Sequence, residues 1–276
     1  MNNLSSILGK LLLTGQICNK EIILSNLNKG QVILQLDKKY VEMLFGNNNN
    51  QDPGYDEQPE AENGHNHFTY DEQDKWLFES GKMQSPINID TFTIAPSIKY
   101  KKLELNFKNQ AMKIENNGHT IELAIPGESI LMNRKFALNQ MHFHSPSEHT
   151  IDGLYSDLEA HFVHTGADGR LAVVGVLFNI GQENLAFETI LNKIPQGSSG
   201  AGFKINISEL LPEDKAYYHY IGSLTTPPLT ENVEWYVLEE KLEISQEQLI
   251  RFQKYYINNN RKTQPLNGRP VNYINN

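Results

Sequence analysis

The sequence predicts a mainly β domain of the α+β class, with a single large central, mostly antiparallel twisted sheet and short peripheral helices. Short apolar runs with the alternation of strands recur from Phe68 onward, turn residues separate these runs, and helical periodicity is rare. The expected strands cover residues 103–107, 113–115, 119–124, 140–144, 159–164, 171–180 and 233–238.

Turn and helix signals complete this prediction. Dipeptides such as Asn117-Gly118 favour turns between the strands. Helical spacing is limited to residues 184–193 and 245–255. At the start of the second segment, Ser245 is followed three residues later by Gln248, which predicts a capping box.

The chain divides into three zones. Residues 1–46 mix helical and strand-like apolar spacing and are too few to bury a core of their own, so we expect an N-terminal extension of unknown role. Residues 47–66 are rich in Asn, Asp, Glu, Pro and Gly, which is typical of an acidic flexible linker. Residues 67–276 are expected to form the one large folded domain.

The charge and the apolar content of the chain argue against two kinds of partner, nucleic acids and membranes. The chain has 24 Lys and Arg against 33 Asp and Glu, a net charge of -9, which argues against a nucleic-acid partner. Much of the excess is local, because nine carboxylates and no Lys or Arg lie between Tyr40 and Asp74. No apolar run approaches the ~18 residues of a membrane helix, so no transmembrane segment is expected.

Cysteine usage favours a cytoplasmic location. Cys18 is the single cysteine of the sequence, so no intrachain disulfide can form. The first nine residues carry no basic side chain, and Lys10 interrupts the apolar run 7–13, unlike a signal peptide. A secreted or periplasmic location is the alternative, if the N-terminus acts as an atypical signal.

Three histidines form a pattern with chemical meaning. His142 and His144 lie two residues apart on an expected strand, so both project from one face and can reach one ion. If the strand that carries His161 pairs antiparallel with the first, His161 completes a trigonal set. Three neutral imidazoles suit Zn²⁺ and leave the fourth tetrahedral position for water, as in catalytic zinc sites.

The histidines also allow other interpretations. A lone His-x-His pair is more often an ordinary surface or packed pair, and the third histidine is what reduces that interpretation. His164 faces away from His161 and is expected in the core, whereas His65, His67 and His219 are expected to face solvent.

The spacing His142-x-His144-x3-Glu148 also fits the beginning of a cupin metal motif, which would imply iron or manganese and oxygen chemistry. That motif requires a glycine where Tyr155 stands, and the sequence lacks its second part, Pro-x-Gly-x2-His. The cupin interpretation is therefore disfavoured.

Four stretches carry a family resemblance, in this order: Gln84–Ile89, Gln140–Ile151, Glu159–His164 and Ser223–Pro228. Together they make residues 68–273 resemble an α-class carbonic anhydrase, and their joint occurrence is highly specific. The resemblance implies that residues 67–276 are an α-carbonic-anhydrase-like catalytic domain. It implies a zinc lyase that reversibly hydrates carbon dioxide to bicarbonate and a proton.

The resemblance also implies roles for individual residues. Zinc-bound hydroxide attacks CO2, while Thr225 accepts the hydroxide's proton and donates its own to Glu148. His119 matches the proton shuttle, and Tyr70 and Asn117 match positions that hold the intervening waters. The remaining matches are the zinc ligands His142, His144 and His161, their outer partners Gln140 and Glu159, and the substrate pocket Val163, Val173, Leu224, Thr226, Val233 and Trp235.

The sequence departs from the family pattern at three positions. Phe68 stands where the family has the first aromatic of a Trp-x-Tyr pattern, and Glu122 stands where it usually has an amide in the cavity. Leu229 stands where many exported bacterial members carry half of a disulfide. The ligands, the threonine and the relay carboxylate are all present.

The expected partners are CO2 and bicarbonate as substrates and sulfonamide-type compounds as inhibitors. A homodimer and a monomer both stay open. The alternative function is a non-catalytic carbonic-anhydrase-like binding domain. Such relatives lose one or more zinc histidines, and this sequence loses none.

Overall fold

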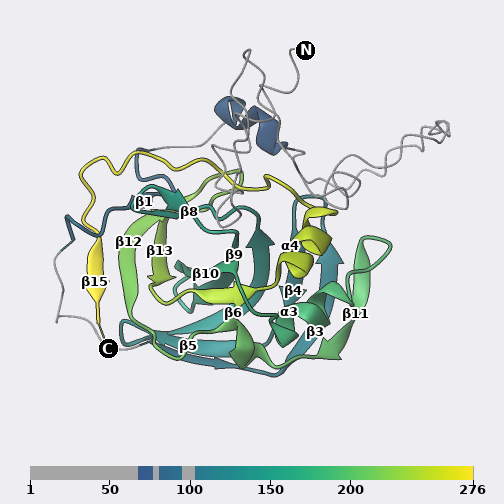
Figure 1. The fold of residues 1–276 in the computed structure, drawn as a ribbon. Coiled ribbons are helices and arrows are strands. Elements are labelled where there is room, and N and C mark those ends of the chain that lie inside the picture. Colours follow the sequence, from purple (N-terminus) through teal and green to yellow (C-terminus); the bar gives the residue numbers. More distant parts are fainter. Residues whose placement is uncertain (1–67, 77–80, 95–102, 276) are drawn as a thin grey trace, which may run out of the picture. The chain divides into compact units, whose positions relative to one another are not determined.

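The computed structural model describes residues 68–76, 81–94 and 103–275 (Figure 1), so the predicted extension and linker lie outside the described residues. The described part is dominated by one large sheet. Its strands are β2 (Glu104–Phe107), β3 (Gln110–Asn116), β4 (Ile121–Ala124), β5 (Gly127–Leu131), β6 (Arg134–His144), β9 (Leu158–Gly166), β10 (Leu171–Ile180), β11 (Ser199–Lys204), β12 (Tyr217–Ser223), β13 (Glu231–Leu238), β14 (Leu242–Ile244) and β15 (Asn272–Ile274).

The strand order of this sheet is β11-β3-β4-β6-β9-β10-β13-β12-β15, with β5 beside β6, β2 beside β5 and β14 beside β10. Among the described strands of the sheet, the parallel pairs are those of β10 with β13 and with β14, and the other pairs are antiparallel. The predicted fold class, a large and mostly antiparallel sheet, is therefore confirmed.

Short elements surround the sheet. A small separate sheet joins β1 (Asn88–Ile89), β7 (Thr150–Ile151) and β8 (Leu154–Tyr155). The described helices are the α-helices α3 (Leu185–Leu191) and α4 (Gln246–Gln253) and the 3₁₀ helices η1 (Tyr70–Lys75) and η2 (Ile207–Leu210). No helix in the described ranges is long and apolar enough to cross a membrane.

The predicted capping box starts α4. The Ser245 hydroxyl accepts a hydrogen bond from the Gln248 backbone N–H at 3.2 Å, and the Gln248 side chain accepts one from the Ser245 N–H at 3.1 Å. Two N–H groups that a helix start would otherwise leave unpaired are thereby satisfied.

The two faces of the sheet contact two different apolar clusters. On β10, Val174 and Val176 belong to a large cluster, whereas Val173 and Leu177 belong to a smaller one. Both faces of β10 are therefore buried, which explains why its sequence is almost continuously apolar. Helices α3 and α4 cover the large cluster, where Phe187 lies 5.2 Å from Phe143 of β6 between ring centroids.

A β-bulge in β6 sets which residues face which cluster. Leu138 pairs with His164 of β9, but Gln140 pairs with Val163, so Asn139 is an extra residue in the ladder. Before the bulge, Leu138 faces the large cluster; after it, Met141 does. As a result, Gln140 and the two histidines that follow project from the opposite face.

Two expectations need correction. The predicted strand 119–124 begins at Ile121, because the Asn117 side chain accepts hydrogen bonds from the N–H groups of His119 and Thr120 and holds them in a turn. His219, expected in solvent, is 5% exposed and lies on β12 opposite Tyr236. Its buried carboxylate neighbour, Glu234, accounts for that burial, with His219 Nε2 3.9 Å from the carboxylate. His65 and His67 lie outside the described residues.

Candidate metal centre

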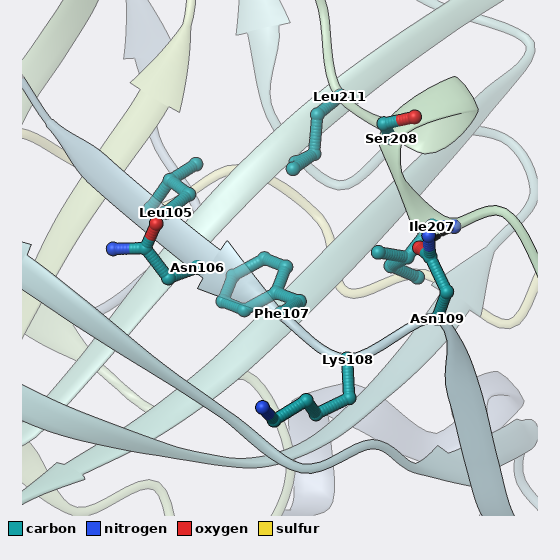
Figure 2. Close-up of a pocket in the computed structure, with 8 residues that line it drawn as sticks. All are labelled: Leu105, Asn106, Phe107, Lys108, Asn109, Ile207, Ser208 and Leu211. Atoms are coloured by element: carbon teal, nitrogen blue, oxygen red, sulfur yellow. Dashed lines mark hydrogen bonds between the residues drawn. The ribbon is translucent and has the colours of Figure 1, made fainter.

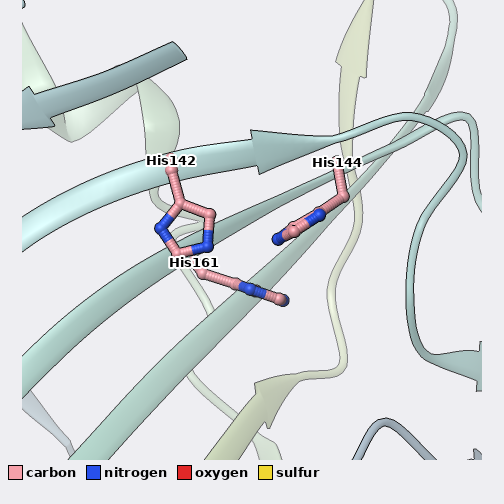
Figure 3. Close-up of side chains that lie close together, drawn as sticks. All are labelled: His142, His144 and His161. Carbon is pink, nitrogen blue, oxygen red and sulfur yellow. The ribbon is translucent and has the colours of Figure 1, made fainter. Parts of the chain in front are cut away.

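Three imidazoles converge from β6 and β9 (Figure 3). His142 and His161 are direct cross-strand partners in the antiparallel pair, and His144 follows on the same face of β6. Each ring offers one nitrogen such that the three nitrogens lie within 4.8 Å of one another. This is the trigonal arrangement that the spacing predicted.

In each of the three rings, one nitrogen is hydrogen-bonded to an oxygen acceptor. An imidazole nitrogen beside a carbonyl or carboxylate oxygen must donate its N–H, so the opposite nitrogen keeps its lone pair. The lone pairs therefore belong to Nε2 of His142, Nε2 of His144 and Nδ1 of His161. The acceptors are Gln140 Oε1 at 2.8 Å from His142 Nδ1, the Asn259 carbonyl at 2.6 Å from His144 Nδ1, and Glu159 Oε1 at 2.9 Å from His161 Nε2.

These ligand atoms fit a zinc ion. Burial lowers the pKa of His142 and of His161, and lowers that of His144 to about 4, so all three imidazoles are neutral at physiological pH. His144 Nε2 is buried and has no hydrogen-bond partner among the described residues. A buried nitrogen lone pair without a partner is costly unless a cation occupies it. His142 is half-exposed, which leaves one side of the site open.

A second group of potential ligands, His149, Glu159 and His161, also lies within 4.8 Å. In this group two of the nitrogens donate hydrogen bonds to the Glu159 carboxylate. His149 Nδ1 lies 2.7 Å and His161 Nε2 lies 2.9 Å from Glu159 Oε1. Glu159 Oε2 also accepts from the backbone N–H groups of Glu148 and His149. This group is therefore a hydrogen-bond cluster that holds His161, and the two nitrogens that face Glu159 donate to it and offer no lone pair to a metal.

Glu148 and Thr225 lie beside the histidines. Glu148 is buried, and its Oε1 accepts a hydrogen bond from the Arg261 backbone N–H at 2.7 Å, while its Oε2 lies 3.9 Å from His161 Nδ1. Burial raises the pKa of Glu148 to about 7. Its interactions with His161, with the Arg261 backbone and with the Thr225 hydroxyl lower the pKa, but by less than burial raises it. Thr225 is itself buried, so its interaction with Glu148 takes place out of contact with solvent.

An apolar wall stands next to the histidines. Val163, Val173 and Trp235 are consecutive cross-strand partners on β9, β10 and β13. Val233 and Leu224 belong to the same small apolar cluster. The Trp235 ring lies 4.9 Å from the His161 ring between centroids, and its N–H donates to the Ser223 carbonyl at 2.9 Å. The half-buried Thr226 follows Thr225 in the loop after β12.

His119 lies in the turn before β4 and is half-buried. Its ring stacks on Phe68 with centroids 3.9 Å apart and an interplanar angle of 10°. The Asn117 side-chain oxygen is engaged in the turn itself, at 3.0 Å from the His119 N–H. Tyr70 is half-buried, and burial together with Glu148 raises its pKa well above the ordinary value.

Several residues of the site are not predictable from the sequence. The carbonyl of Asn259 accepts from His144, and the backbone N–H of Arg261 donates to Glu148. Both contacts use the main chain, so no side-chain signal could have found them. Tyr220 lies 2.7 Å from His149 Nε2, and its hydroxyl hydrogen-bonds Ser85 at 2.8 Å. His164, by contrast, lies in the core as expected, beside the Ser129 hydroxyl.

A cavity of about 330 Å³ is separate from these residues (Figure 2). It contains none of the predicted site residues. Its lining side chains are Leu105, Asn106, Phe107, Lys108, Asn109, Ile207, Ser208 and Leu211. The chemistry of the three histidines therefore does not involve this cavity.

The fold and the site together define a class of proteins in which one large sheet carries three imidazoles whose free nitrogens face one space. The chain belongs to the eukaryotic-type carbonic anhydrase family, whose sequence model matches residues 71–275. The resemblance seen in the sequence is thereby confirmed.

Relatives agree with this membership. The chain is similar to a carbonic anhydrase of Pectobacterium carotovorum, with 42% identity over 201 residues, 71% of this chain and 81% of the relative. Its structure is similar to the α-carbonic anhydrase of Thermovibrio ammonificans in complex with sulfanilamide, with a TM-score of 0.65, 40% identity, and coverage of 69% and 87%. It is also similar to a dioscorin of Dioscorea japonica, with 34% identity over 206 residues, 70% of this chain and 76% of the relative.

Proposed function

We propose that the protein catalyses the reversible hydration of carbon dioxide to bicarbonate and a proton, with one zinc ion on His142, His144 and His161. The observation that carries the proposal is the set of three neutral nitrogens directed at one space, beside Glu148, Thr225 and an apolar wall. Zinc bound there supplies Lewis acidity that makes a nucleophile from water at neutral pH, for which carbonic anhydrases are the standard example.

The surrounding residues orient the reactants. Thr225 would accept a hydrogen bond from the attacking oxygen, because its own proton is directed at the buried carboxylate of Glu148. That arrangement points an oxygen lone pair at the substrate carbon. Carbon dioxide carries no charge, so the apolar side chains of Val163, Val173 and Trp235 suit it better than polar ones.

The proton released in each turnover leaves through His119 in this proposal. A histidine is suited to the task because its ordinary pKa lies near neutral pH. His119 is half-buried in a turn, so it can face both the site and solvent. The stacking of its ring on Phe68 supports an outward position from which a proton can pass to buffer.

The test is a stopped-flow assay of CO2 hydration on the zinc-loaded full chain, with zinc content measured in parallel. We expect one zinc per chain and activity that sulfanilamide suppresses. A chain that holds zinc but shows no sulfonamide-sensitive hydration would instead favour the non-catalytic binding function. The similarity to dioscorin gives that alternative its one support, whereas the complete set of three histidines favours the enzyme.

We also propose a cytoplasmic location. The single cysteine supports it, because exported proteins often carry disulfides. Cell fractionation with N-terminal mass determination tests it, and a processed protein in the secreted or periplasmic fraction would overturn it.

A further inference from the structure

A carboxylate lies in the same transverse row of the sheet as the metal ligands. Glu122 on β4 is the direct cross-strand partner of His142 on β6, which in turn is the partner of His161 on β9. On the other side of β4, Glu122 is the partner of Glu115 on β3. Directly paired residues of neighbouring antiparallel strands share a face, with Cβ atoms about 5 Å apart. Strands β3, β4 and β6 lie side by side in Figure 1.

The neighbours of Glu122 fix the direction of its side chain. Ile121 and Leu123 are fully buried in the large apolar cluster, as is Met141, the partner of Leu123. Since successive side chains of a strand alternate, Glu122 projects to the opposite face, the one that carries His142. Both residues are half-exposed, so the open side of the metal site and the carboxylate share one solvent-facing surface.

The charge of Glu122 is not neutralised by the cation nearby. Lys113 lies on the same side and forms its ion pair with Glu115, with Nζ and Oε1 2.5 Å apart. Among the described residues, no ion pair of 4.0 Å or less includes Glu122. Burial and the charge of Glu115 raise its pKa, while Lys113 lowers it. The carboxylate therefore lies next to the opening without an ion-pair partner in the described part of the chain.

We propose that Glu122 is a specificity-determining residue that weakens the binding of small anions at the three-histidine site without weakening the binding of neutral molecules. The inference rests on the proposed function, because it requires a metal on these histidines. The Glu122 carboxylate repels an anion bound at the neighbouring histidines, because both are negatively charged and only partly screened by solvent. It exerts no such force on an uncharged ligand. The product bicarbonate is an anion and the substrate carbon dioxide is not, so the same field favours release of the product.

The experiment uses the full chain loaded with Co²⁺, whose visible absorption reports ligand binding directly and without a turnover assay. Wild type, Glu122→Gln and Glu115→Gln are titrated with thiocyanate, a small anion, and with imidazole, a neutral ligand, at pH 8.5 and low ionic strength. Glu115→Gln is the matched control, because that carboxylate lies in the same row but one strand farther from His142 and is paired with Lys113.

We expect Glu122→Gln to bind thiocyanate about three- to tenfold more tightly than wild type, and the gain to shrink when ionic strength is raised to ~0.5 M. Imidazole affinity changes less than twofold, and Glu115→Gln behaves like wild type. Equal thiocyanate affinities of wild type and Glu122→Gln, or an equal gain for imidazole, would overturn the inference while the metal site stands. A wild-type chain that takes up no Co²⁺ would overturn the proposed function itself, and the inference with it.

Discussion

His142 and His161 are cross-strand partners on β6 and β9, so a single residue pair of the sheet fixes two of the three proposed metal ligands. This pair lies between strands whose other faces are buried in the large apolar cluster. The ligand geometry is therefore set by the core and not by a loop, which favours a rigid and preorganised site.

The first prediction concerns the ligands. His142→Ala removes one of three donor nitrogens, and we expect zinc per chain to fall from about one to near zero and hydration activity to fall by more than about 100-fold. Metal analysis after gel filtration measures the first, and stopped-flow measures the second. His164→Ala is a useful comparison, since that buried histidine is not directed at the site; full zinc retention by His142→Ala would refute the ligand assignment.

Glu159→Gln tests the outer partner of His161. The substituted amide cannot accept all four N–H groups that Glu159 receives, so His161 loses its fixed orientation. Zinc affinity is expected to fall about 10- to 100-fold. Competition with a chelator measures it, and an unchanged affinity would show that Glu159 serves stability alone.

Thr225→Val separates orientation from metal binding. The substitution keeps the shape of the side chain but removes its hydroxyl, so the attacking oxygen is no longer directed. We expect kcat/KM to fall about 100-fold with zinc content unchanged. If zinc is lost together with activity, Thr225 supports the fold instead.

His119→Ala tests proton transfer. In weak buffer, turnover is expected to fall on the order of tenfold to a hundredfold, because the released proton has no side-chain relay. Added imidazole should restore part of the rate without changing zinc content. A variant that is as slow in strong buffer as in weak buffer, and indifferent to imidazole, would place the shuttle elsewhere.

Glu234 gives a pH prediction away from the site. This carboxylate is buried and bonded to Arg134, to Arg170 at 3.1 Å and to the Tyr236 hydroxyl at 2.6 Å. Burial raises the pKa of Glu234, but interactions with His219, Arg134 and Tyr236 outweigh it and lower the pKa from 4.5 to about 2. A depressed folded-state pKa stabilises the fold above the unfolded pKa, and the contribution disappears as pH falls through the folded pKa.

Glu234→Gln should therefore lower the free energy of unfolding by about 2 kcal/mol at pH 7, a figure reduced for the half-exposed arginines. The difference from wild type should shrink between about pH 4.5 and 2, as urea denaturation at several pH values would show. Glu128→Gln, which removes an exposed ion pair with Lys135, should cost less than about 0.5 kcal/mol at any pH. A pH-independent deficit in Glu234→Gln would contradict the account.

The sequence predicted those elements whose pattern is local. Strands such as β10 and the capping box of α4 could be predicted because apolar alternation and the Ser245–Gln248 spacing act over a few residues. Strand β11 was missed because its sequence, Ser199–Lys204, contains two glycines and few apolar side chains. Its pairing with β3, and not its intrinsic preference, makes it a strand.

The candidate site also has a part that local sequence spacing predicts and a part that depends on distant contacts. The histidines could be predicted because the two-residue period of a strand fixes their common face. The acceptor for His144 could not, because it is the main-chain carbonyl of Asn259, 115 residues away in the chain. The prediction that His219 faces solvent was wrong for a related reason. Its neighbour Glu234 lies on the adjacent strand β13, and the sequence alone does not show that β12 and β13 pair.

The extra residue at Asn139 has a consequence for how this sequence can change. If the ladder before the bulge continued unbroken, position 142 would oppose Ala160, and the even- and odd-numbered side chains of the second half of β6 would exchange faces. The bulge takes up this one extra residue, so that the pairing resumes with Gln140 opposite Val163 and His142 opposite His161. Deletion of Asn139 would therefore leave a regular ladder with the imidazoles on their present face, whereas a strand that kept the residue without the bulge would turn them into the apolar interior.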